Sequence, residues 1–178
     1  PHVKKPSLFR ETFTVVVTAI ALSVLVRTFL VQAFYVPSES MMNTLLDNDR
    51  IIVSKLGTKV TGVHRGNVIV FHDPGSWLGD GYSNPYDTPV GHVLQWVGIV
   101  PANSGKDLVK RVIGVGGDTV ECCDVNGKIM LNGKPLDEPY IHDNDPTNQV
   151  NFKVLVPEGK LWVMGDNRAN SEDSRFHL

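Results

Sequence analysis

The sequence predicts a mainly β protein, an antiparallel β-sandwich or open barrel that follows one N-terminal transmembrane helix. Three observations carry this prediction. An uncharged apolar stretch of helical length lies near the N-terminus. After Pro37 the chain changes to short β-rich runs separated by turn dipeptides. Hydrophobic residues make up 42% and charged residues 20%, as in an ordinary globular domain, and a net charge of -2 argues against a nucleic-acid partner.

The predicted transmembrane helix covers residues 12–34. Residues 12–26 carry no charge but would span only roughly 22 Å, short of a roughly 30 Å hydrocarbon core. Apolar residues continue beyond Arg27 to Phe34, so the span is long enough if Arg27 reaches an interface. Cations precede the segment and are absent between Arg27 and Arg50, which puts residues 1–11 in the cytoplasm and residues 35–178 outside.

Two alternatives to a retained anchor stay open. A cleavable signal peptide would also have cations, an apolar stretch and a small-residue end such as Val31-Gln32-Ala33. A core helix of a soluble protein is the other alternative, although the segment is apolar nearly all round. We favour the retained anchor.

The remainder is expected to form short strands. Asn126-Gly127 and Asn132-Gly133 are hairpin dipeptides that need positive φ. The expected strands are Ile51–Leu56, Val68–Phe71, Leu108–Ile113, Thr119–Cys123, Lys128–Leu131, Val154–Val156 and Leu161–Met164. Many short strands at close spacing are typical of an antiparallel sandwich or open barrel.

Two polar stretches, 72–104 and 141–151, are expected to be loops. The first contains Trp77 and Trp96, which either pack on the sheet or enter the bilayer interface beside the anchor. Cys122 and Cys123 lack zinc spacing, so they are either a vicinal disulfide or two strand residues that face opposite sides; we favour the second interpretation.

Three segments could carry chemistry. Ser38 and Ser40 would point the same way in an extended chain, so one could attack while the other stabilises an oxyanion. Lys110 and Arg111 would face opposite sides of a strand, which directs one cation inward. A buried lysine loses charge through desolvation and can act as a general base.

The third segment is the dense polar run 164–175, whose acidic and basic side chains could fix a loop through charge-assisted bonds. These local patterns leave the three segments separate. They also leave open a Ser–His–Asp site, because the chain contains His64, His72, His92 and His142.

Together the segments closely resemble bacterial type I signal peptidase, the Ser–Lys dyad serine endopeptidase family. An apolar anchor is followed by 37–45, similar to the family's P-S-x-S-M-x-P-T-L. Residues 65–71 resemble R-G-D-V-V-V-F, and 109–120 resemble V-K-R-V-I-G-x-x-G-D-x-V. Residues 165–175 resemble G-D-N-x-x-x-S-x-D-S-R. The blocks occur in the family's order.

The resemblance implies a role for each matching residue. Ser40 matches the nucleophile and Lys110 the general base. The Ser40 backbone N–H and the Ser38 hydroxyl match the oxyanion hole. The residues that match lysine-orienting and supporting positions are Ser171, Asp173, Arg175 and Arg168. No metal and no cofactor is implied; the implied partners are preprotein signal peptides with Ala-x-Ala-like ends and the lipid bilayer of the bacterial plasma membrane.

The sequence departs from the family's pattern at a few positions. Asn43 stands where the family has Pro, which is expected to loosen that turn without touching a catalytic group. Asn67 replaces Asp, and Ala169 stands where many members have Asp. The family continues past Arg175 with a further strand, so a chain that stops at Leu178 is expected to be truncated at its C-terminal end.

Other classes of protein compete with this interpretation. A self-cleaving repressor-type Ser–Lys protease shares the dyad but lacks an anchor like residues 12–34. A non-catalytic, membrane-anchored β binding module is the second alternative. A Cys transpeptidase is weaker, because Cys122-Cys123 has no matching His and Arg setting.

Overall fold

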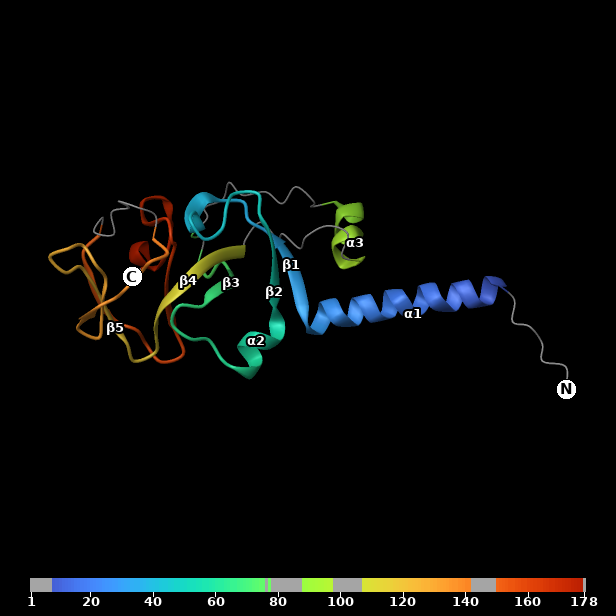
Figure 1. The fold of residues 1–178 in the computed structure, drawn as a ribbon, viewed down its shortest axis with the longest axis horizontal. Helices are drawn as coiled ribbons and strands as arrows, with labels where there is room; N and C mark the ends of the chain where they lie inside the picture. Colours follow the sequence, from blue (N-terminus) through green and yellow to red (C-terminus); the bar gives the residue numbers. More distant parts are fainter. Residues whose placement is uncertain (1–7, 76, 78–87, 98–106, 142–149, 178) are drawn as a thin grey trace.

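A computed structural model describes residues 8–75, 77, 88–97, 107–141 and 150–177. Its first element is α1 (Leu8–Phe29), a long helix that projects away from the β-rich body (Figure 1). Residues Leu8–Val26 are long and apolar enough to cross a membrane, and none of that window is buried within the protein. The hydroxyls of Thr12, Thr14 and Thr18 donate to carbonyls four residues earlier, so these polar groups are satisfied within the helix.

The helix begins earlier and ends earlier than predicted. It includes Arg10 and Glu11, and it stops at Phe29. The expected helical continuation to Phe34 is wrong, because residues 31–35 form strand β1 (Val31–Tyr35). This strand pairs antiparallel with β2 (Arg50–Ser54), from Val31 opposite Ser54 to Tyr35 opposite Arg50. A partner strand that is distant in sequence therefore overrides the apolar run.

The β-rich body contains two further sheets, and every described strand pair is antiparallel. One sheet has the order β3-β4-β9, formed by Val68–His72, Asp107–Val115 and Leu161–Met164. The other has the order β7-β6-β5-β8, formed by Lys134–Pro135, Met130–Leu131, Thr119–Cys122 and Phe152–Leu155. The predicted mainly antiparallel β fold with one N-terminal apolar helix is thus confirmed.

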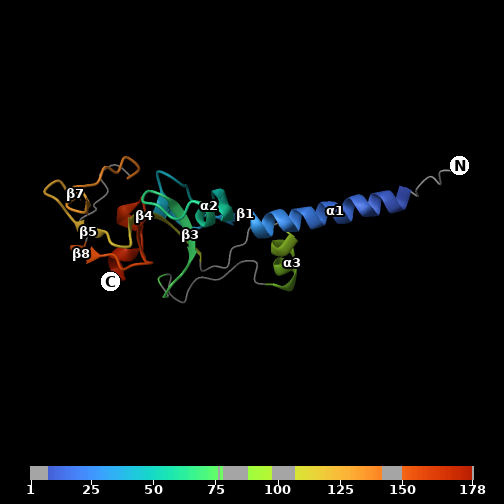
Figure 2. The same ribbon diagram turned by 90° about the horizontal axis from the view of Figure 1, so that it is seen from below.

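Two predicted elements have a different structure. The expected strand over residues 51–56 ends at Ser54, whose hydroxyl accepts from Gly57 N and caps helix α2 (Lys55–Val60). The expected loop 72–104 contains helix α3 (Pro89–Val97), which lies beside α1 near its junction with β1 in both views (Figures 1 and 2). Proline at the first helical position is a helix-start signal that outweighed the surrounding loop composition.

The two tryptophans of that stretch have different outcomes. Trp77 stacks on His177 with ring centroids 4.6 Å apart and meets the edge of Phe71 at 6.0 Å, so this residue packs on the protein. The side chain of Trp96 lies outside the described part, and its insertion into a bilayer stays a prediction.

The predicted turns are partly confirmed. Asn132 and Gly133, between β6 and β7, both have positive φ, at 52° and 76°. At the other dipeptide only Gly127 does, with φ 78°. There Asp124 Oδ1 accepts from the backbone N–H groups of Asn126 and Lys128, so a carboxylate organises the turn.

The second part of strand β4 packs into the apolar core. Its register shifts between Val112 and Gly114, and beyond that point it enters an apolar core. A Cβ on Gly114 would lie 2.7 Å from Val120 Cγ2, so only glycine allows this close packing. The buried core residues are Ile113, Val120, Cys122, Ile129, Phe152, Val156, Trp162 and Met164.

Cys122 and Cys123 form a disulfide. The favoured interpretation, two strand residues facing opposite sides, was wrong. Strand β5 ends at Cys122, so the alternation of a strand does not extend to Cys123.

Candidate active site

Ser40 lies in a short 3-10 turn, Glu39–Met41, that directly follows β1. Backbone bonds from Val36 N to Asp49 O and from Asn48 N to Val36 O close the chain around this turn. Val36 and Met41 are buried and anchor the turn in the core. The turn therefore holds Ser40 in place with its side chain largely shielded, at 8% exposure.

Lys110 lies in the middle of β4, opposite Ile69 of β3. Its side chain is 2% exposed, which confirms that one cation of the Lys110-Arg111 pair points inward. The Nζ atom lies 2.7 Å from Ser40 Oγ, within hydrogen-bond distance. Two residues separated by 70 positions thus meet in a buried contact.

Burial governs the charge of this amine. Desolvation lowers the pKa of Lys110 from 10.5 to about 8. The negative charge of Asp173 opposes that shift, and the positive charge of Arg175 adds to it. A useful fraction of Lys110 is therefore uncharged near neutral pH and able to accept a proton.

Ser38 lies beside the same contact. Its hydroxyl is 3.2 Å from Ser40 Oγ, and Ser38 itself is exposed. The two hydroxyls therefore lie close together, although Ser40 is in a 3-10 turn and not in the extended chain on which the expected i, i+2 alignment rests.

The loop 165–171 packs directly against the Ser40 turn. A Cβ on Gly165 would clash with Ser171 Oγ and with the Ser40 carbonyl oxygen, so glycine is required for this approach. Asn167 N donates to Ser40 O at 3.1 Å, and Asn167 Nδ2 donates to Glu39 O at 3.0 Å. Sequence reasoning did not assign a role to Asn167, although it belongs to the dense polar run.

A buried ion pair supports this loop from behind. Asp173 and Arg175 are 0% and 1% exposed and pair at 2.8 Å. Asp173 also accepts from Gly165 N at 3.0 Å and from Ser171 Oγ at 2.7 Å. Burial favours the neutral acid, but bonds from Arg175 and these donors outweigh it and hold the pKa of Asp173 below its usual value.

Further ion pairs extend the polar support around the same loop. Arg111 pairs with Asp166 through Nε at 2.8 Å and Nη2 at 2.6 Å, and Thr44 Oγ1 donates to the same carboxylate. Arg168, which is fully buried, pairs with Glu138. Glu138 had no signal in the sequence, because an acidic residue beside a proline looks like part of a solvated loop.

Comparison with known proteins places this arrangement in a family. The profile of the family described as signal peptidase, peptidase S26, matches residues 9–177. The chain belongs to this family. A probable signal peptidase I of Mycobacterium leprae (strain TN) is 40% identical over 98% of this chain, and signal peptidase I U of Bacillus subtilis (strain 168) is 33% identical over 93%.

The matches cover different shares of those proteins. The chain spans 66% of the length of the mycobacterial relative and 79% of the Bacillus one. A crystal structure of a signal peptidase I from Enterococcus faecalis V583 is 28% identical, with a TM-score of 0.40, and the match covers 64% of this chain and 84% of that chain.

Against the pattern of the peptidase family, the structure locates each matching residue. Hydrogen bonds join Ser38 and Lys110 to Ser40, and join Ser171, Arg175 and Arg168 around Asp173. The bond from Asn167 N to Ser40 O connects the two groups. Ser171 Oγ donates to Asp173, so its part in orienting Lys110 stays a prediction. The described histidines that would support a Ser–His–Asp site lie on other segments: His64 and His72 are exposed, and His92 is on α3.

The departures from the family pattern have local explanations. Asn43 has φ 86°, a conformation closed to proline but accessible to asparagine. Rather than loosening the turn, Asn43 ties it to the carbonyls of Tyr140 and Ile141. Asn67 Oδ1 accepts from His64 N and closes a surface turn, and Ala169 is exposed.

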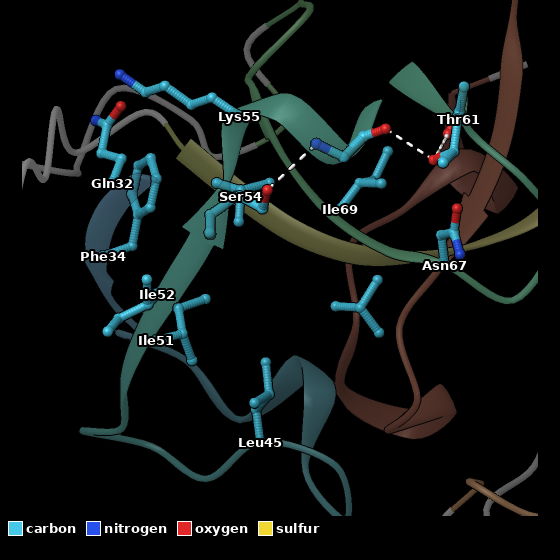
Figure 3. Close-up of a pocket in the computed structure, with 15 residues that line it drawn as sticks. Gln32, Phe34, Leu45, Ile51, Ile52, Ser54, Lys55, Thr61, Asn67 and Ile69 are labelled. Carbon is cyan, nitrogen blue, oxygen red and sulfur yellow. Dashed lines mark hydrogen bonds between the residues drawn. The ribbon is translucent and has the colours of Figure 1, made fainter. Parts of the chain in front are cut away.

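A groove of about 740 Å³ is lined by residues of β1, β2 and β3, and neither Ser40 nor Lys110 is among its lining residues. Figure 3 shows Phe34, Ile51 and Ile52 of β1 and β2 on one side and Ile69 of β3 on the other. Strand β1 leads into the Ser40 turn, and Ile69 is the register partner of Lys110. The apolar groove is therefore bounded by strands next to the segments that carry Ser40 and Lys110.

Proposed function

We propose that this protein is a membrane-anchored serine endopeptidase that cleaves N-terminal signal peptides from exported preproteins, with Ser40 as nucleophile and Lys110 as general base. The observation that carries the proposal is the 2.7 Å contact between Lys110 Nζ and Ser40 Oγ at a buried amine whose pKa is about 8. Membership of the peptidase family supports the same assignment.

The reaction follows from this contact. Neutral Lys110 takes the Ser40 hydroxyl proton as Oγ attacks the scissile carbonyl carbon. The resulting oxyanion is stabilised by the Ser40 backbone N–H and the Ser38 hydroxyl. Lys110, now an ammonium, gives its proton to the leaving amine as the C–N bond breaks. Lys110 then activates a water that hydrolyses the acyl ester and frees Ser40.

The remaining site residues would act through these groups. Ser171 and Asp173 would influence the position and charge of the Lys110 amine. Arg175 and Arg168 would hold the loop 165–171 in place. An extended substrate would lie in the groove of Figure 3 and pair with a strand edge, since β3 ends its sheet among the described strands. Alternate side chains would then enter pockets, and small pockets would select Ala-x-Ala-like ends.

The same proposal assigns the domains and the location. Residues 1–11 would be cytoplasmic, an anchor within 12–34 would cross the bacterial plasma membrane once, and the β-rich domain of 35–178 would lie on the extracytoplasmic side. The apolar, unburied surface of α1 supports an anchor, and cations before the segment support the orientation. Such an anchor would hold the active site near the outer surface of the membrane, where signal peptides emerge.

Cleavage of a preprotein by the detergent-solubilised chain tests the proposal, with the cut mapped by mass spectrometry. We expect a single cut after a small residue, and loss of cleavage by at least about 10⁴-fold in Ser40→Ala and Lys110→Met. An intact preprotein after incubation with the wild-type chain would favour the binding module. Turnover near the wild-type rate in either variant would refute the dyad.

A further inference from the structure

The segment 138–141 follows β7 and lies outside every sequence block that resembles the family. It nevertheless contacts three parts of the site. These are the Ser40 turn, the Lys110 strand (β4) and the loop 165–171, which we call the Ser171 loop. We propose that Glu138 and Tyr140 of this segment, which we name the 138–141 clamp, are positioning residues that hold these three parts together for catalysis. The proposal rests on the function proposed above.

The clamp holds the Ser171 loop through Arg168. Glu138 accepts from Arg168 Nη2 at 2.5 Å and from Nη1 at 3.2 Å, a two-point contact with both side chains buried. Arg168 Nε donates to Gly165 O at 2.8 Å, and Arg175 Nη2 donates to Arg168 O at 2.9 Å. Without Glu138, the buried guanidinium at the centre of this loop would lose its described carboxylate partner.

The clamp holds the Lys110 strand through Arg111. The Tyr140 ring lies under the Arg111 guanidinium, with 3.9 Å between Cζ and the ring centroid, and Tyr140 OH donates to Glu138 Oε1 at 2.9 Å. Arg111 directly follows Lys110 on β4 and pairs with Asp166 of the Ser171 loop. The Tyr140 hydroxyl thus links the ring under Arg111 to Glu138, which is the carboxylate partner of Arg168.

The clamp holds the Ser40 turn through Asn43. Asn43 Nδ2 donates to the carbonyls of Tyr140 and Ile141, both at 3.3 Å. Asn43 comes three positions after Ser40 within the same closed turn. The Ser40 turn, the Lys110 strand and the Ser171 loop therefore all contact the clamp. In the described bonds, the clamp itself touches neither Ser40 Oγ nor Lys110 Nζ.

This placement predicts a defined effect on the chemistry. The loop that Arg168 anchors packs against Ser40, and Asp166 of this loop and Asp173 just after it lie close enough to Lys110 to act on its pKa. If the loop loosens, water reaches Lys110, and its pKa moves back toward the ordinary value. The charged groups that face the amine are Asp173, Glu172 and Asp166, which raise its pKa, and Arg175, which lowers it. A misplacement of about 1 Å at such a site costs on the order of 10²-fold in rate.

The test compares the full wild-type chain with Glu138→Gln in detergent, using preprotein cleavage over a range of pH. We expect kcat to fall about 10- to 100-fold with KM within about twofold, and the acidic limb of the kcat profile to move to higher pH. Glu138→Asp, which keeps the charge, is expected to recover part of the loss. A loss that is only structural would instead lower the active fraction without moving the limb.

Two further variants complete the test. Tyr140→Phe keeps the ring under Arg111 and removes only the bond to Glu138, so we expect a fall in kcat of about 2- to 5-fold. Glu121→Gln is the matched control, because Glu121 pairs with Lys153 at 2.9 Å on an exposed face of the neighbouring sheet. The control is expected to keep the wild-type kcat and pH profile.

The outcomes separate the clamp from the proposed function. Wild-type kcat and an unmoved acidic limb in Glu138→Gln overturn the clamp, while cleavage that still depends on Lys110 preserves the proposed function. If Glu138→Gln does not fold, Tyr140→Phe decides, and an unchanged kcat in that variant overturns the clamp. A wild-type chain that cleaves nothing overturns both proposals.

Discussion

Lys110 and Ile113 of β4 are both buried, but in very different surroundings. Before the register shift, Lys110 enters an interior with a buried carboxylate and guanidinium, Asp173 and Arg175, nearby. At the shift, Ile113 enters the hydrophobic core. The apolar half is stabilised by burial that any well-shaped hydrophobic residue supplies. The polar half depends on particular partners, because an unpaired buried charge is costly.

Breaking the polar half is expected to have the largest effect on stability. Asp173→Ala leaves Arg175 buried without its carboxylate, and we expect a loss of about 3–5 kcal/mol in the free energy of unfolding. Denaturant unfolding followed by tryptophan fluorescence measures it. Glu172→Ala is the matched control, because Glu172 is exposed and pairs with His177 on the surface. Equal losses in the two variants would contradict the comparison.

Breaking the apolar half is expected to cost less. Ile113→Ala removes buried carbon from the core, and we expect a loss of roughly 2–4 kcal/mol under the same unfolding conditions. The cleavage profile against pH should keep its acidic limb, since Ile113 has no part in the charge of Lys110. Val125→Ala serves as control, because Val125 is fully exposed and should change stability by less than about 0.5 kcal/mol.

A fall in pH should affect the site around Lys110 but not the apolar core, so it distinguishes the two regions without a mutation. Burial lowers the pKa of Lys110 to about 8, so the amine gains a proton as pH falls through that value and can no longer act as a base. We expect kcat to fall about 50-fold from pH 8 to pH 6, with the fold intact by circular dichroism. A rate that stays level over this range would show that the proton acceptor is not a lysine with this pKa.

The smallest expected change in the free energy of unfolding is a gain, and it comes from a substitution that abolishes activity. Lys110→Met replaces a desolvated amine with an apolar side chain of similar length. We expect it to abolish cleavage while raising the free energy of unfolding by about 1–2 kcal/mol at pH 7. Thermal unfolding of the variant beside the wild-type chain measures this change. A clear loss of stability would mean that the amine stabilises the fold, contrary to the comparison.

Much of the fold could be predicted from local patterns, and the misses have physical causes. The sequence predicts helix over the residues of strand β1, because an apolar run near a helix has the same composition in either structure. Only pairing with β2 distinguishes them. Helix α3 was missed because its flanks are rich in turn residues. The disulfide was not favoured, because adjacent cysteines in a β-rich run fit strand alternation equally well.

The candidate site shows the same division. The motifs identified Ser38, Ser40, Lys110 and the polar run, and the alternation of β4 predicted one inward cation. Glu138 and Tyr140 had no such signal, because their importance arises from contacts with residues far along the chain, as in the Glu138–Arg168 pair, whose members are 30 positions apart. Asn43 was expected to weaken its turn, and its two bonds to the clamp became visible only in three dimensions.

By itself, the sequence determined the antiparallel β character, the N-terminal apolar helix and the residues that belong to the peptidase family. Patterns of alternation, turn chemistry and motif spacing are local and survive in the linear chain. The tertiary structure alone decided where the helix gives way to a strand, which charges are buried together and how far Lys110 is shielded from water. Desolvation depends on every atom around a group, and those atoms are assembled only by folding.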